Sequence, residues 1–203
     1  MSVITTVEEL EAIYGTPRET SMRKEVAQLN TKYRELIGAS PFFAFATVGP
    51  DGLDCSPRGD RGTAVTIEDD STLLIPDRKG NNRIDSLRNI VTDPRVALLF
   101  LIPGHDVSLR INGTASISVA EDLIERFVVD GSGPRSVVKV HIETVYFQCA
   151  RALMRSELWS QSAHVDPSSL PTCGQILEEI TSGDMRAADY DPDLYERLRE
   201  QLF

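Results

Sequence analysis

The chain has 203 residues, of which 41% are hydrophobic and 26% are charged, and its formal net charge is -10. This length suits one domain with a sizeable core. The acidic balance argues against nucleic acid as a partner, because phosphate backbones are bound by broad basic surfaces. No apolar run approaches the roughly 20 residues that span a bilayer, so no membrane insertion is expected. The first residues lack the basic and apolar regions of a secretory signal, and we therefore expect a cytoplasmic protein.

The first part of the chain, residues 1–40, is predicted to be helical. Residues 5–14 form one predicted helix. Residues 20–37 form a longer amphipathic helix, in which apolar side chains recur at intervals of three and four. Gly38 and Pro41 end this helix. We expect the whole segment to pack on the structure that follows.

From residue 41 onwards the pattern changes to short strands joined by turns. Apolar runs and alternating residues between turn signals predict the strands, and amphipathic runs predict the helices between them. The predicted strands are residues 42–49, 53–56, 63–67, 72–76, 95–102, 107–118 and 136–148. The predicted helices are residues 82–92, 119–128, 149–159, 173–183 and 191–201.

Strands in hairpin order with helices inserted at intervals do not fit a parallel doubly wound sheet. A mainly β fold, an antiparallel barrel with peripheral helices, fits better, since closure removes open strand edges. We divide the chain into the helical segment 1–40, a barrel at residues 41–160 and a helical extension at residues 161–203.

Cysteines and histidines do not suggest a metal site. The three cysteines are far apart, odd in number and form no Cys-x-x-Cys pair, so we expect reduced thiols in partly buried places. None of the three histidines has metal-ligand spacing, and structural roles are expected for them. These residues are Cys55, Cys149, Cys173, His105, His141 and His164.

Basic residues are concentrated in one short part of this acidic chain. Residues 58–95 hold seven of its 21 lysines and arginines. A local basic pocket on an acidic body fits a small anion better than a polymer. A solvated basic surface is the alternative.

The stretch "IPDRKGNNR", residues 75–83, has the features of a phosphate site. Arg78 and Lys79 can make charge-assisted hydrogen bonds to a phosphate, and Gly80 allows the backbone to approach closely. A second loop, residues 56–62, ends an adjacent predicted hairpin. The two loops could therefore meet in space.

A helix predicted to begin near Asn81 or Asn82 would direct its free N–H groups and dipole at the same point. Arg83, one turn into that helix, could reach back. The two asparagines could instead serve only as helix caps. The chain contains neither the glycine-lysine pattern of a P-loop nor a dinucleotide fingerprint.

Five segments of the chain, in order, match the pattern of a known family. They read "SPFFAFATVGPDGLDCSPRGD", "LLIPDRKGNNRIDSLRNI", "PRVALLFLIPG", "LRINGTASIS" and "YFQCARALMRSELW". Together they cover about residues 38–160 and resemble the FMN-binding split barrels related to pyridoxamine 5'-phosphate oxidase. The resemblance is strongest to a subgroup with SPRGD and IPDRxGNxR motifs. It implies a six-stranded antiparallel split barrel and a homodimer with one FMN per subunit at the interface.

The resemblance also implies which residues contact FMN. Arg78 and Lys79 match the family's phosphate-binding pair. Arg58 matches an arginine that approaches the phosphate or the ribityl chain, and Gly59 and Asp60 would lie along the flavin edge.

Further FMN contacts are implied from other parts of the chain. Arg83 matches a position near the phosphate. Arg110 matches a polar position near the flavin, where a cation would favour the anionic reduced ring. Arg155 and Trp159 resemble a segment that reaches the partner's cofactor, with a helix end and core packing as the alternative. The rest of the predicted set is Pro76, Asp77 and Asn82.

No protein-borne catalytic set stands out, so catalytic residues stay unassigned, and the flavin would supply any redox chemistry. We expect an FMN-dependent oxidoreductase of a small molecule, with NAD(P)H as a candidate hydride donor. A non-enzymatic FMN carrier or redox sensor is the alternative, and a haem-utilising relative is a further one. Authentic pyridoxamine phosphate oxidases carry an Arg-x-His element near the C-terminus. This chain has none after Trp159, which makes oxidation of vitamin B6 the less favoured activity.

Overall fold

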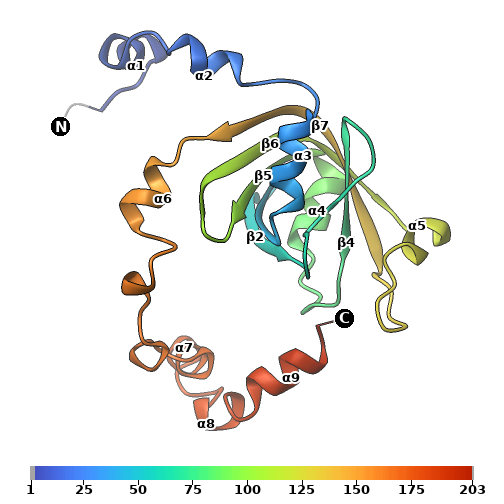
Figure 1. The fold of residues 1–203 in the computed structure, drawn as a ribbon. Helices are drawn as coiled ribbons and strands as arrows, with labels where there is room; N and C mark the ends of the chain where they lie inside the picture. The colour runs from blue at the N-terminus through green and yellow to red at the C-terminus, as the bar shows by residue number, and fades with distance from the viewer. Residues whose placement is uncertain (1–2, 203) are drawn as a thin grey trace.

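The computed structural model describes residues 3–202 and is built around one antiparallel sheet (Figure 1). Its strands are β1 (Phe42–Gly49), β2 (Gly52–Gly59), β3 (Thr66–Ile67), β4 (Thr72–Asp77), β5 (Arg95–Ile102), β6 (His105–Ser118) and β7 (Ser136–Gln148). The strand order is β2-β1-β5-β6-β7-β4-β3, and each neighbouring pair is antiparallel. The sheet is therefore open, with β2 and β3 as its edges.

The predicted class, mainly β with peripheral helices, is confirmed. The seven strands predicted from the residues are all present, whereas the number of six that the family resemblance implies is wrong. The sheet has seven strands. The shortest strand is β3, which keeps only the last two residues of the predicted strand 63–67. Ala64 and Val65, just before it, are instead buried in the core as irregular backbone.

Helices surround the sheet and form both ends of the chain. They are α1 (Val7–Tyr14), α2 (Glu19–Arg23), α3 (Thr31–Gly38), α4 (Asp85–Thr92), α5 (Glu121–Glu125), α6 (Arg151–Ser156), α7 (Cys173–Ile180), α8 (Ala187–Tyr190) and α9 (Leu194–Glu200). Figure 1 shows α1 and α2 projecting from one side of the sheet, while α6 to α9 form an extended arc beside it. None of the helices in the described residues is long and apolar enough to cross a bilayer.

The core lies on the concave side of the sheet because alternate residues of each strand point inward. Phe43 and Phe45 of β1, Phe100 of β5 and Ile111 of β6 are all buried there. The rings of Phe43 and Phe100 have their centroids 5.1 Å apart. Two helices close this core, because α3 buries Ile37 and α4 packs against β1 and β6.

The N-terminal segment contributes only its last helix to this core. Neither α1 nor α2 has a buried residue, whereas α3 does. The predicted continuous helix 20–37 is wrong, since Val26 pairs with Val145 of β7 through backbone N–O distances of 3.1 and 2.8 Å. The side chain of Asn30 then caps α3 by accepting a hydrogen bond from a backbone N–H. The pairing of Val26 with β7 and the cap at Asn30 therefore interrupt the predicted helix 20–37.

The prediction that the cysteines are partly buried is also wrong, because Cys55, Cys149 and Cys173 are all exposed. Cys55 lies on the outward face of the edge strand β2, where alternation leaves it on the side away from the core. Within residues 3–202, no group of three or more His, Cys, Asp and Glu side chains gathers in a way that could hold a metal ion.

Candidate anion-binding cleft

The two basic loops predicted to meet are held together by an ion pair. Asp60, just after β2, places Oδ2 2.9 Å from both Nε and Nη2 of Arg78, just after β4. Arg78 also donates from Nη1 to the carbonyl oxygen of Phe127, at 2.6 Å. The side chain of Arg78 is 18% exposed and that of Asp60 is 13% exposed. This partly buried pair fixes the ends of two strands that are not neighbours in the sheet.

Beside this pair lies a cleft of about 520 Å³, formed by the ends of β2 and β4, the start of α4 and the start of β7. Such a volume is typical of small-molecule sites. Five cations and three carboxylates line it. The charged residues are Arg58, Arg78, Lys79, Arg83, Arg135, Asp54, Asp77 and Asp85. The cleft is therefore a locally cationic region on an acidic chain.

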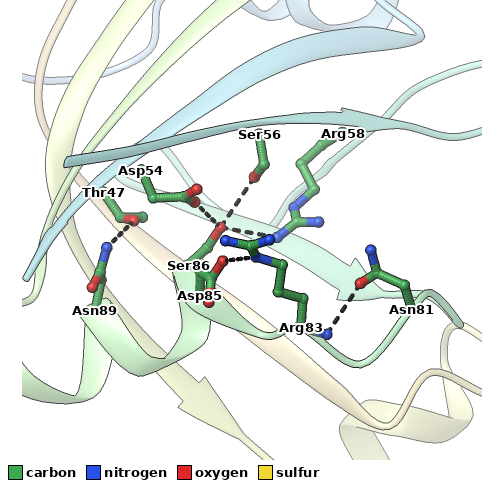
Figure 2. Close-up of polar contacts among 9 residues, drawn as sticks. All are labelled: Thr47, Asp54, Ser56, Arg58, Asn81, Arg83, Asp85, Ser86 and Asn89. Atoms are coloured by element: carbon green, nitrogen blue, oxygen red, sulfur yellow. Dashed lines mark hydrogen bonds and ion pairs between the residues drawn. The ribbon is translucent and has the colours of Figure 1, made fainter. Parts of the chain in front are cut away.

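The loop between β4 and α4 has a special backbone. Asn82 and Ile84 have φ angles of 61° and 51°, in the left-handed region that L-residues rarely adopt. The predicted helix start at Asn81 or Asn82 is therefore wrong, and α4 begins at Asp85. The side chain of Asn81 instead accepts a hydrogen bond from the backbone N–H of Arg83, at 3.0 Å (Figure 2). Asn81 thus closes a local turn on the rim of the cleft.

Ser86, in the first turn of α4, connects this helix to β2 (Figure 2). Its hydroxyl donates to Asp54 Oδ2 at 2.6 Å and lies 3.0 Å from the hydroxyl of Ser56. It also accepts from Arg58 Nη2 at 3.3 Å. Ser86 is only 3% exposed, so its polar group needs such partners. Three alternate residues of one strand therefore converge on one hydroxyl, which positions Arg58 beside the cleft.

Two of the five cations are engaged by carboxylates. Besides the pair of Arg78 with Asp60, Arg83 pairs with Asp85 at the start of α4. Arg83 precedes the helix, contrary to the prediction that it lies one turn inside, and its side chain is 80% exposed. The pair draws the guanidinium of Arg83 toward the helix start (Figure 2).

The other three cations, Arg58, Lys79 and Arg135, take no part in the ion pairs of residues 3–202. Arg58 is held by the neutral hydroxyl of Ser86. Arg135 donates from Nη1 to the neutral Oδ1 of Asn82, at 2.7 Å. Neutral acceptors orient a guanidinium without neutralising its charge.

Asp77, the last residue of β4, is the half-buried carboxylate in the cleft. Burial raises the pKa of its side chain above the ordinary value, and the positive charges of Arg58 and Arg135 oppose that rise. Both guanidinium groups therefore act electrostatically on the same carboxyl group. One comes from β2 and the other from the residue before β7.

Arg135 was not predicted from the sequence. It precedes Ser136, which pairs with Asp77 in the register of β4 with β7. The turn residues before Ser136 and the strand after it were recognisable, but the pairing of these two strands was not. The signal would have been a basic residue just before a strand that pairs with β4, since β4 leads into the predicted phosphate loop.

Half of the predicted FMN set lies in this cleft, namely Arg58, Asp77, Arg78, Lys79, Asn82 and Arg83. Pro76 and Asp60 line a smaller cavity of about 210 Å³, to which Arg78 also contributes. Gly59 ends β2 and lines neither of these two cavities. A Cβ at Gly59 would approach the carbonyl oxygen of Pro41 to 3.2 Å, so a close backbone contact accounts for the glycine.

The remaining three predicted residues lie apart from the cleft. Arg110 is in β6, with its guanidinium 5.3 Å from the ring centroid of Tyr146. Trp159 donates from Nε1 to the carbonyl oxygen of His105, at 3.0 Å. Arg155 is exposed in α6. None of these three side chains lines the cleft.

The sequence matches a known protein family over much of its length. Residues 29–149, more than half of the chain, match the family described as Pyridoxamine 5'-phosphate oxidase. This range contains the whole sheet and the cleft. A search of curated proteins found no significant match.

Several solved structures are similar to between 56% and 59% of the chain. HupZ from Group A Streptococcus is 21% identical, with a TM-score of 0.48, over 59% of this chain and 93% of that one. General Stress Protein 26 from Bacillus anthracis is 16% identical, with a TM-score of 0.39, over 56% and 88%. An F420 reductase is 18% identical, with a TM-score of 0.43, over 59% and 98%. With TM-scores below 0.5, the family assignment rests on the sequence match.

Proposed function

The chain belongs to the pyridoxamine 5'-phosphate oxidase family, and we propose that it binds a flavin in the cleft between β2, β4, α4 and β7. Members of this family typically bind flavins. The observation that carries the proposal is the gathering of five cations around a cleft of about 520 Å³ in an acidic chain. A flavin nucleotide combines a ring system with an anionic phosphate, and both a cavity and a basic rim suit it.

We propose FMN as the flavin. Its phosphate dianion would be held by the cations of the cleft, with Arg78 and Lys79 as the pair predicted from the sequence. Each hydrogen bond to a charged group contributes about 1.5–3 kcal/mol. Riboflavin has the same ring without the phosphate, so the difference between the two ligands measures the contribution of the basic rim.

A bound flavin supplies redox chemistry that amino-acid side chains lack. The residues of the chain would hold the phosphate, orient the ring and limit water access. We propose an oxidoreductase that acts on a small molecule, with NAD(P)H as the hydride donor to be tested. A carrier or redox sensor is the second candidate, favoured by the cleft lining, in which arginines, aspartates and small polar residues predominate. Vitamin B6 oxidation is disfavoured by the missing Arg-x-His element.

We also propose that the protein is a homodimer. The outward face of the sheet carries apolar side chains, among them Phe42 of β1, Leu53 of β2 and Leu99 of β5, which are all exposed. Burying such a face against a second copy would remove apolar surface from water. In that assembly Arg155 and Trp159 would approach the flavin of the partner subunit, and light scattering would give the oligomeric state directly.

Flavin binding is tested by thermal unfolding and fluorescence titration of the full chain with FMN and riboflavin. A ligand at 100 times its dissociation constant adds roughly 2.7 kcal/mol to stability, so a clear rise in melting temperature is expected with FMN. A chain that neither retains nor binds FMN would overturn the proposal. Steady oxidation of NAD(P)H by the FMN-loaded protein with an added acceptor would then separate an enzyme from a carrier or sensor.

A further inference from the structure

We propose that Arg135, before β7, and Arg58, in β2, form a clamp on the anionic group of the ligand. In the same arrangement, the ion pair of Arg78 with Asp60 serves mainly to hold the loops that frame this clamp. The identity of the anion as the phosphate of FMN rests on the proposed function. The existence of the clamp does not, because it is argued from the positions and partners of the cations alone.

The first argument is convergence. Arg58 comes from β2 and Arg135 from the residue before β7, and, against the rise caused by burial, the positive charges of both act to lower the pKa of Asp77. Both also line the same cleft. Two guanidinium groups that line one cleft from different elements, and whose charges act on the same carboxyl group, can both approach an anion bound there.

The second argument is the nature of their partners. Arg58 contacts the hydroxyl of Ser86, and Arg135 contacts the amide oxygen of Asn82. These acceptors are neutral, so they fix the direction of each side chain without forming an ion pair with it. Asn82 is itself held in the left-handed region, with φ 61°, so the acceptor for Arg135 is set by the loop backbone. The clamp is thus oriented in advance, which lowers the entropy lost on binding.

The third argument is the contrast with Arg78. Its Nε and Nη2 face Asp60, and its Nη1 donates to the carbonyl oxygen of Phe127. A phosphate would have to compete with the carboxylate of Asp60 for this guanidinium. Arg58 and Arg135 have no such ionic competitor among the described ion pairs. Planar guanidinium groups also suit bidentate binding of phosphate oxygens.

Asp77 is one of the three carboxylates that line the cleft, and the charges of both arginines oppose the rise that burial causes in its pKa. An incoming dianion would be repelled by a charged carboxylate at this place. The raised pKa of Asp77 means that burial already favours its uncharged form, so less free energy is needed to neutralise it when an anion binds. The clamp can therefore operate although one carboxylate lies inside it.

The test uses Arg135→Ala in the full chain, with Arg18→Ala as a matched control. Arg18 is an exposed residue before α2, and its substitution changes the net charge by the same amount. The dissociation constants of FMN and riboflavin are measured for each protein, and the melting temperature is followed with inorganic phosphate. Arg135→Ala is expected to raise the FMN constant about tenfold or more, with riboflavin affinity unchanged. Arg135→Lys keeps the charge and is expected to have an intermediate effect.

Three outcomes would overturn the clamp. One is an unchanged FMN constant in Arg135→Ala, and another is an equal loss for FMN and riboflavin. The third is a wild-type protein that binds neither FMN nor phosphate. If the wild-type protein is stabilised by phosphate but not by FMN, the proposed flavin function fails. The clamp then stands only if Arg135→Ala abolishes the phosphate effect while Arg18→Ala retains it.

Discussion

The cleft and the region around Arg110 differ in how completely one chain builds them. In the cleft, Arg58 of β2 is hydrogen-bonded to Ser86 of α4, and beside it Arg78, after β4, is paired with Asp60, after β2. Around Arg110 the contacts are local, with Tyr146 beneath the guanidinium and Trp159 bonded to the backbone of β6. Both regions were predicted to contact FMN, but only the first brings its residues together within one chain. A single chain is therefore sufficient to test the first region, whereas the second is tested against the proposed homodimer.

Among the substitutions in the two regions, Arg78→Ala is expected to have the largest effect on stability. The substitution leaves the partly buried Asp60 without its ion-pair partner. Loss of one partner of a buried pair costs about 3–5 kcal/mol, and the lower end is expected here because the pair keeps some exposure. Urea unfolding measures the loss. The double variant Arg78→Ala with Lys79→Ala is expected to lose most of the FMN-induced rise in melting temperature as well, because it removes both the ion pair that frames the cleft and Lys79, a further cation that lines it.

The control for this prediction is Asp60→Asn combined with Arg78→Ala. It removes the unpaired charge and is expected to recover part of the stability lost in the single variant. A single variant as stable as the wild-type protein would show that the pair does not hold the two loops. The cleft would then owe its shape to other contacts.

Ser86→Ala is expected to have the next largest effect. The buried hydroxyl joins Asp54 and Arg58, and its removal leaves their polar atoms without this partner. Such a loss costs about 1–3 kcal/mol. FMN affinity is expected to fall as well, because Arg58 is no longer oriented. Stability and affinity are compared with those of Ser116→Ala, an exposed serine of β6, and equal behaviour of the two variants would contradict the positioning role.

Arg155→Ala tests whether the other region contacts a flavin that is bound to a partner subunit. If Arg155 contacts the flavin of a partner subunit, FMN binding weakens in the dimer and is unchanged in the monomer. An exposed charge contact contributes about 0.2–1 kcal/mol, so an effect of roughly 1.4- to fivefold is expected. Titrations above and below the protein concentration at which the dimer dissociates measure it, with Arg151→Ala on the same helix as the control. The same change at both concentrations would place the effect within one chain.

The smallest expected effect is that of Asp77→Asn. Because the folded-state pKa is raised, the carboxyl group favours folding below its unfolded pKa, and this contribution is lost as the pH rises through the folded value. The asparagine variant removes this dependence and is expected to be the more stable protein at neutral pH. Urea unfolding at acidic and neutral pH measures the difference. A variant that is less stable than the wild-type protein at neutral pH would contradict the prediction.

The sequence was informative wherever the signal was local. The bounds of β1 and β5 follow directly from apolar runs between turns, and both match the structure. The start of α4 was missed because the left-handed Asn82 and Ile84 interrupt a run that has helical composition. Propensity describes the average preference of a residue, and the loop geometry here overrides it.

Long-range contacts could not be predicted in the same way. The bridge of Val26 with Val145 divides a helical pattern, and the pairing of β4 with β7 brings Arg135 into the cleft. Both depend on residues far apart in the sequence, which periodicity does not report. The ion pair of Arg78 with Asp60 was not predicted either. The two loops were expected to meet, but the pattern of the sequence does not show that these two side chains pair.

The open strand order has a consequence for how the protein behaves in concentrated solution. An unpaired sheet edge can template strands from other chains, and proteins avoid this with short strands, prolines and charges at the edges. Here one edge, β3, is two residues long. The other edge, β2, carries Pro57, which lacks a backbone N–H, between the inward-facing Ser56 and the basic Arg58. The residues that surround the cleft therefore also make β2 a poor template for fibre growth.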